Sequence, residues 1–245
     1  MIPNPTQSGK VPAITPVYWT LALAAATLAE TAGRSGAAAL NLDEHQTLGL
    51  LALAFAISLM GQWTARTFRP WLYWTTMLGA TLLGNAVADQ ARSLSTLTEP
   101  ALIALGVCLL ATILAFWKLI SGHISPSRPQ HRDEPLYWMA ILISETLGTL
   151  LGDWTAHAWG NERPFLLLGL GAIAAILYTR TSLSRTVLFC STLVLLRPFG
   201  ADIGELLGNP LALGGFDMSH LSASVSALVF MALVLAGFRQ QTRPV

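Results

Sequence analysis

The stretch that decides the fold is LYWMAILISETLGTLLGD at residues 136–153, which combines an apolar helical run with small residues and two acids. It recurs three more times in the chain without gaps. The other copies are VYWTLALAAATLAETAGR at 17–34, LYWTTMLGATLLGNAVAD at 72–89 and LFCSTLVLLRPFGADIGE at 188–205. Four copies of one segment predict a tandem repeat whose units pack against one another.

Small residues recur at fixed places in the four copies. With Trp19, Trp74, Trp138 and Cys190 taken as anchors, the position ten residues on holds Ala29, Gly84, Gly148 and Gly200. Four residues further come Gly33, Ala88, Gly152 and Gly204. This small-xxx-small spacing lets membrane helices approach closely. The pattern therefore predicts tight packing between helices, with close approach to a solute as the alternative.

The composition points to a membrane protein. Of 245 residues, 53% are hydrophobic and 11% are charged, whereas soluble domains carry about 25% charge. The net charge of +1 offers no basic surface, so nucleic acid is excluded as a partner. The two cysteines, Cys108 and Cys190, lie in apolar runs, which excludes a disulfide scaffold and a Cys-rich metal finger. The N-terminus lacks a signal-peptide pattern, so the first helix is expected to be retained.

The fold expected from these runs is all-α: a polytopic protein of eight transmembrane helices, arranged as four tandem helical hairpins. Each span needs about 20 mostly apolar residues. The predicted spans are about 15–34, 47–66, 70–90, 99–120, 135–156, 163–180, 184–206 and 219–238. The even-numbered spans hold long uncharged runs and should face lipid, with the polar odd-numbered spans inside.

A Pro-, Ser- and charge-rich loop divides the chain into two halves of four helices each. The expected units are 1–122, a cytoplasmic linker at 123–134, and 135–245. Lys and Arg residues give the orientation, because short cytoplasmic loops are enriched in them. Ten would lie on the side of the N-terminus and three on the other, which are Arg34, Arg92 and Arg163. Both termini are therefore expected in the cytoplasm of a bacterial cell, with the protein in the inner membrane.

Charged residues inside the odd-numbered spans are the candidate functional residues. The candidates for solute or ion binding are Glu30, Asp89, Glu145, Asp153, Arg197, Asp202 and Glu205. Glu145 and Arg197 are both seven residues after their anchors, about 10 Å into the membrane, so they are expected to neutralise one another. Only Arg34 and Arg197 oppose six acids in these helices. This excess of negative charge implies water, bound cations or protonated carboxyls, whereas a purely structural network would be more nearly balanced.

A metal-ligand pair is a further expectation. Asp153 and His157 are four residues apart and would share one helix face near the external side. The alternative is that His157, near a helix end, simply meets water.

Several segments carry a resemblance to a known family. KVPAITPVYW with AETAG, LGTLLGDW, and LLRPFGADIGELLGNPLALGG resemble a bacterial family known as uncharacterised membrane-anchored proteins. The likeness covers nearly the whole chain and implies an eight-helix architecture with repeated Gly and acid motifs. The sequence departs from the family pattern at Arg34, where an acid is expected, and at Glu205, where Asp is expected.

Two functions from different classes are compatible with these features. The first is an integral membrane transporter of a cation, because tandem repeats often gather ionisable groups around one cavity. A divalent metal as the solute and coupling to protons are the more specific expectations. Oxygen ligands suit hard cations such as Mg²⁺, Mn²⁺ or Ca²⁺, which would be substrate rather than cofactor. The second is a non-transporting scaffold or accessory subunit. An enzyme is not expected, since no catalytic motif occurs. The expected partners are the lipid bilayer, a small cation, and a second copy or another membrane protein.

Overall fold

The chain is helical throughout the part that the structure describes. The structure is a computed structural model that describes residues 10–65, 67–122, 124, 126, 131–160, 185–211 and 215–237. In this part the fold is all-α, with seven α-helices and one short 3-10 helix. They are α1 (Pro16–Leu40), α2 (Glu44–Thr64), α3 (Pro70–Leu94), α4 (Glu99–Ser121), η1 (His131–Asp133), α5 (Glu134–Trp159), α7 (Arg185–Gly208) and α8 (His220–Gly237).

Seven of the eight predicted spans coincide with these helices. The predicted span at 163–180 lies outside the described residues, as do Arg163 and the side chain of Arg34, so the count of eight is not confirmed. Two of the central helices extend several residues beyond the predicted C-terminal ends. The first continues to Leu40 and the third to Leu94, which places Arg92 inside a helix rather than in a loop.

Local sequence signals explain where the helices begin. Prolines occupy the first turn of α1, α3, α4 and α5, where their missing N–H costs nothing and their fixed φ suits a helix. At the start of α2, the Asp43 carboxylate accepts from the Gln46 N–H at 2.7 Å, and the Gln46 side chain accepts from the Asp43 N–H. This reciprocal capping satisfies two backbone donors that the helix itself leaves unbonded.

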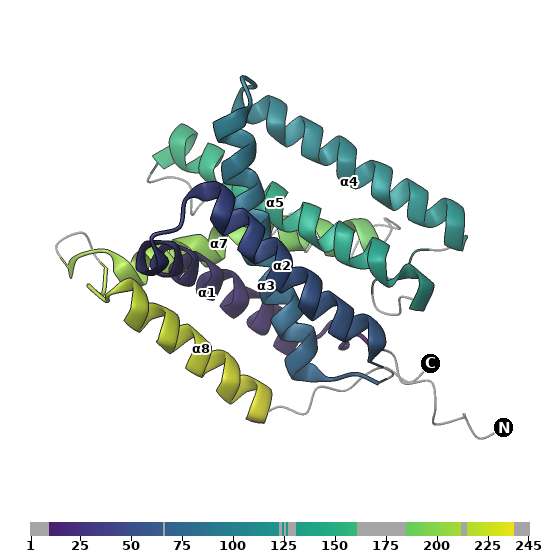
Figure 1. Cartoon of the computed structure of the whole chain (residues 1–245), viewed down its shortest axis with the longest axis horizontal. Helices are drawn as coiled ribbons and strands as arrows, with labels where there is room; N and C mark the ends of the chain where they lie inside the picture. Colours follow the sequence, from purple (N-terminus) through teal and green to yellow (C-terminus); the bar gives the residue numbers. More distant parts are fainter. Residues whose placement is uncertain are drawn as a thin grey trace.

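The helices that carry the repeat are gathered in the middle of the molecule. In cyclic order, α1 packs on α3, α3 on α5, α5 on α7, and α7 back on α1. The other helices lie outside this ring, with α2 packed on α3, α4 on α5 and α8 on α1. Figure 1 shows α4 and α8 on opposite sides of the central helices. The prediction of polar helices inside and apolar helices outside is confirmed for the described helices.

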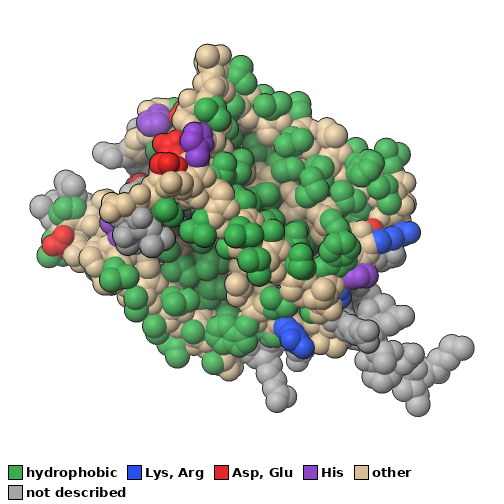
Figure 2. All heavy atoms as spheres, viewed as in Figure 1, with side chains coloured by type: hydrophobic (Ala, Val, Ile, Leu, Met, Phe, Trp, Pro, Cys, Tyr) green, Lys and Arg blue, Asp and Glu red, His purple; other side chains and the backbone are tan. Residues whose placement is uncertain are grey.

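The outer helices expose apolar surface. Four described helices are long and apolar enough to cross a membrane: α2, α4, α7 and α8. In the apolar 18-residue stretch of α2, α4 and α8, only 6–11% is buried inside the protein, against 44% in α7. Large apolar side chains therefore remain exposed on the outer helices, among them Leu53, Ile57, Met60, Leu105, Leu119, Leu221 and Leu233. Figure 2 shows hydrophobic side chains spread across this face of the molecule.

The small residues of the repeat set the spacing inside the ring. A Cβ on Gly84 would lie 2.9 Å from the Glu145 Cβ, and one on Gly148 would lie 2.6 Å from the Arg197 Cβ. A Cβ on Gly200 would lie 2.4 Å from the Ala26 Cβ. In each case, the small residue ten positions after its anchor contacts the residue seven positions after the anchor of the next helix. The recurrence of one contact around the ring means that the central helices are parallel and similarly packed.

Candidate solute cavity

The N-terminal ends of the central helices are closed by aromatic side chains. The residue before each anchor is Tyr18, Tyr73, Tyr137 or Phe189, and each is at most 5% exposed. The Tyr73 hydroxyl lies 2.6 Å from the Tyr137 hydroxyl and 3.2 Å from the Tyr18 hydroxyl. The Phe189 ring completes the group, with its centroid 6.0 Å from that of Tyr18 and 6.4 Å from that of Tyr137. These four residues, called the aromatic cluster below, fill the middle of the ring at this end.

The C-terminal halves of the same helices enclose a cavity of about 420 Å³. All four central helices contribute to its lining, and α2 covers one side. The lining residues are Ala29, Glu30, Gly33, Leu42, Glu44, Thr47, Leu51, Leu82, Asn85, Ala86, Asp89, Arg92, Thr149, Asp153 and Arg197. The cavity opens at the end where Asp89 and Asp153 are exposed. Buried apolar side chains such as those of Leu21, Met77 and Leu193, followed by the aromatic cluster, lie between the cavity and the other end.

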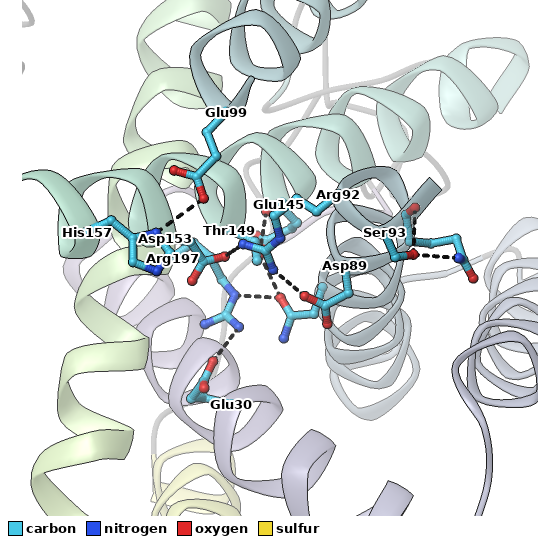
Figure 3. Close-up of polar contacts among 12 residues, drawn as sticks. Glu30, Asp89, Arg92, Ser93, Glu99, Glu145, Thr149, Asp153, His157 and Arg197 are labelled. Carbon is cyan, nitrogen blue, oxygen red and sulfur yellow. Dashed lines mark hydrogen bonds and ion pairs between the residues drawn. The ribbon is translucent and has the colours of Figure 1, made fainter. Parts of the chain in front are cut away.

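Arg197 forms the inner part of the cavity wall. Its side chain is 2% exposed, and its Nη2 donates to the Glu30 Oε2 of α1 at 2.9 Å. Its Nε donates to the Asn85 Oδ1 of α3 at 2.9 Å, and its Nη1 donates to the Ala26 carbonyl at 3.4 Å. Because every nitrogen of the guanidinium has an acceptor, this buried charge is neutralised and held in one orientation. Figure 3 shows the group reaching from α7 toward α1 and α3.

Asn85 connects three of the central helices. Its Oδ1 accepts from Arg197 and also from the Thr149 hydroxyl of α5, at 2.8 Å. Two donors on one oxygen fix the orientation of the amide, since its nitrogen could not accept from either. The network thus joins α3, α5 and α7 across the middle of the ring.

The mouth of the cavity carries a second group of charges (Figure 3). Arg92 of α3 forms ion pairs with Asp89 on its own helix and with Asp153 of α5. Asp89 is 57% exposed and Asp153 is 39% exposed, so both carboxylates reach solvent at this end. These two acids occupy equivalent positions in their repeats, and the structure brings them together on one guanidinium.

The charges lining the cavity are not balanced. The lining includes four carboxylates, from Glu30, Glu44, Asp89 and Asp153, and two guanidinium groups, from Arg92 and Arg197. When all are ionised, two negative charges are in excess. A cavity of this kind attracts cations, because low-dielectric walls concentrate the field of the charges that line it.

The predicted direct ion pair between Glu145 and Arg197 is not formed, although the Arg197 charge still acts on the Glu145 carboxyl. Arg197 forms its ion pair with Glu30 instead, because its side chain extends toward α1 rather than back toward α5. Glu145 is 4% exposed and does not line the cavity. Among the described residues, its Oε2 has no hydrogen-bond partner. The Thr81 hydroxyl of α3 faces its carboxyl, and Glu145 lies by register between the cavity and the aromatic cluster.

The remaining predicted site residues lie in different surroundings. Asp202 and Glu205 lie in the last third of α7, partly buried and outside the cavity lining. His157 is exposed and contacts the Glu99 Oε1 at 3.2 Å, whereas Asp153 pairs with Arg92. In the described part of the chain, no group of three or more His, Cys, Asp or Glu side chains is close enough to hold a metal ion. The metal pair Asp153 and His157 stays a prediction.

Sequence reasoning missed three residues of the site: Asn85, Arg92 and Thr149. A signal was available for Asn85, since it directly follows the small residue of its repeat and is polar within an apolar run. Thr149 holds the same position after Gly148 in the next copy. Arg92 was assigned to a loop because the predicted helix ended too early. No protein-family model matches this chain, and it matches neither a curated protein nor a solved structure.

Proposed function

We propose that the protein is an integral membrane transporter of a small cation, built from eight spans in four tandem hairpins. The observation that carries the proposal is the cavity with excess negative charge, which opens at one end of an apolar bundle and is closed at the other. A transport site reached from one side at a time is the common plan of secondary transporters built from repeats.

The exposed apolar helices support a place in the membrane. A water-soluble monomer rarely leaves a continuous apolar surface of this extent uncovered, whereas lipid tails cover it without cost. The Thr and Ser hydroxyls inside the central helices, such as those of Thr27, Thr81 and Ser144, donate to carbonyls one turn earlier in their own helices. Such internal pairing suits an interior without water.

The charge distribution supports the proposed orientation in a bacterial inner membrane, with both termini cytoplasmic. Lys10, Arg69, Lys118, Arg132 and Arg185 are all near the end that holds the aromatic cluster, before a central helix or after an outer one. In Figure 2, the visible Lys and Arg side chains lie at one end, and most visible acidic and His side chains lie at the other. By the positive-inside rule, the cavity would open to the external side.

The solute is a hard cation that keeps part of its water. Asp89 and Asp153 offer carboxylate oxygens at the cavity mouth, and the cavity has room for several water molecules beside an ion. Mg²⁺ is commonly held by one or two carboxylates together with water, and Mn²⁺ also takes oxygen ligands. A divalent cation therefore fits the site without a complete cage of protein ligands.

The scaffold hypothesis has less support. It relies on small-residue faces that are available to partner helices, but Gly84, Gly148 and Gly200 each contact a neighbouring helix of this chain. Self-association through another surface stays a prediction.

The proposal can be tested in cells. A strain that lacks the protein would be complemented with the original chain, with Asp153→Asn, or with Glu99→Gln, which removes an acid at the same end that does not line the cavity. We expect that growth on one metal salt depends on the original chain. The cellular content of that metal should depend on it as well. Asp153→Asn should behave as the deletion, and Glu99→Gln as the original. Equal metal contents in all four strains, at equal protein levels, would contradict it.

A further inference from the structure

We propose that the aromatic cluster is the inner gate of the transport path and that α7 is the helix that moves to open it. The inference rests on the proposed function, because a gate has meaning only for a cavity through which a solute passes. It identifies the residues that close the path and the one central helix that moves.

The hydrogen bonds of the cluster are distributed unevenly. Tyr73 joins Tyr18 and Tyr137 through its hydroxyl, so α1, α3 and α5 are linked by a continuous chain of three hydroxyls. The equivalent residue on α7 is Phe189, which has no hydroxyl and contacts the cluster only through its ring. At this level Phe189 contributes ring contacts only, while Cys190 beside it faces the Ser144 hydroxyl of α5. Phe189 can therefore leave the cluster without breaking a hydroxyl hydrogen bond, whereas Tyr18, Tyr73 and Tyr137 cannot.

A proline weakens α7 at the right place for such a movement. Pro198 lies inside the helix and has no N–H to donate to the Val194 carbonyl one turn earlier. A Cβ on Gly148 of α5 would lie only 2.7 Å from the Val194 carbonyl oxygen. The interrupted turn of α7 therefore packs directly against a glycine of α5. Helices bend most readily at such positions, since the missing hydrogen bond removes the restraint on the turn.

The interrupted turn contains Arg197 and so lies at the level of the cavity, one to two turns beyond Phe189. Phe189 lies eight residues before Arg197, about 12 Å along the helix. Arg197 is fixed by Glu30, Asn85 and Ala26, all on α1 or α3. A cation that competes for the Glu30 carboxylate would loosen these contacts beside Pro198. The part of α7 that carries Phe189 would then be free to swing away from the three tyrosines.

The chain carries its own reporter for this movement. Cys190 directly follows Phe189 and is 3% exposed, and the other cysteine, Cys108, lies exposed on α4. In a Cys108→Ser background, the rate at which N-ethylmaleimide labels Cys190 measures how often the gate region opens. The measurement uses the full chain in proteoliposomes and requires no knowledge of the solute.

Three substitutions in this background test the gate. Tyr73→Phe removes the hydroxyl that holds Tyr18 and Tyr137 together, and Phe189 packs on the rings of these two residues. With the two rings loosened, the labelling rate of Cys190 should rise by up to roughly thirtyfold, the limit set by the loss of two hydrogen bonds. Phe189→Tyr supplies the missing hydroxyl and should lower the rate. Thr75→Val is the matched control, because its hydroxyl donates only within its own helix, to the Trp71 carbonyl. It should leave the rate unchanged.

A fourth substitution tests whether α7 is the moving helix. Pro198→Ala restores an N–H that can bond to the Val194 carbonyl. Combined with Tyr73→Phe, it should return the labelling rate to that of the background. The gate proposal is contradicted if Cys190 is labelled no faster in Tyr73→Phe than in Thr75→Val, in protein whose thermal unfolding is unchanged. The proposed movement of α7 is contradicted if Pro198→Ala leaves the faster labelling of Tyr73→Phe unchanged. Because labelling is measured without any solute, these failures are distinct from an absence of cation transport.

Discussion

Arg197 of α7 donates to the Glu30 carboxylate of α1 at 2.9 Å, and this ion pair closes the ring of central helices. The two residues are 167 positions apart in the chain. They join the first repeat to the last, and the same guanidinium also bonds to Asn85 of the second repeat.

Removal of one partner should therefore destabilise the fold strongly. Glu30→Gln leaves the buried Arg197 charge without its anion, at an expected cost of about 3–5 kcal/mol. Titration of the purified protein with a denaturing detergent measures the unfolding free energy. Combining Glu30→Gln with Arg197→Gln should recover part of the loss.

A matched comparison distinguishes Glu30 from Glu145 as the partner of Arg197. The double-mutant cycle of Glu145→Gln with Arg197→Gln should show a much smaller interaction energy than the cycle with Glu30→Gln. The assigned ion pair would be refuted by a larger coupling to Glu145 than to Glu30.

Gly84, Gly148 and Gly200 should not tolerate an added methyl group. Gly200→Ala would place a Cβ 2.4 Å from the Ala26 Cβ, so α7 and α1 would have to separate. Overpacking of this kind costs typically about 1–3 kcal/mol. Gly49→Ala on α2, where no atom lies within 4 Å, serves as control and should be stabilising by up to about 1 kcal/mol. Equal effects of the two changes on unfolding free energy would show that the close packing is unimportant.

Particular residues show which parts of this arrangement could be predicted from the sequence. The inward position of α1, α3 and α5 followed from their charges and from the repeated small residues, because neither suits a lipid-facing surface. The sequence also placed Glu145 and Arg197 correctly at one level. Each helix of a ring has two neighbours, however, and the level does not determine which neighbour a long side chain reaches. Arg197 extends to α1, where the Glu30 carboxylate and the Ala26 carbonyl accept from it.

We expect Arg92 to compete with a bound cation for the two carboxylates at the cavity mouth. Its replacement in Arg92→Ala frees Asp89 and Asp153, so binding of Mn²⁺ to the purified protein, followed by electron paramagnetic resonance, should become tighter. Since these side chains are partly exposed, the cost in stability should be within about 1 kcal/mol. Arg132→Ala removes an exposed arginine from the opposite end and should leave Mn²⁺ binding unchanged. Weaker binding in Arg92→Ala would mean that Arg92 assists the cation rather than competing with it.

The orientation can be examined with reporter fusions. Fusions after Arg69, Arg132 and Arg243 should report the cytoplasm, and fusions near Asp43, Ser95 and Asp217 should report the external side. If even two of these six positions reported the opposite side, either the number of spans or the orientation would have to be revised.

The central claim is that the acid-rich cavity moves a cation across the membrane, and flux into proteoliposomes tests it most directly. Purified protein would be reconstituted, and entry of Mg²⁺, Mn²⁺, Ca²⁺, Na⁺ and K⁺ would be followed separately with ion-sensitive dyes. The account predicts flux of at least one cation above that of empty vesicles, reduced at least about tenfold in Asp153→Asn and unchanged in Glu99→Gln. If folded, correctly inserted protein moved none of these cations, or if Asp153→Asn moved them as fast as the original chain, the claim would be contradicted.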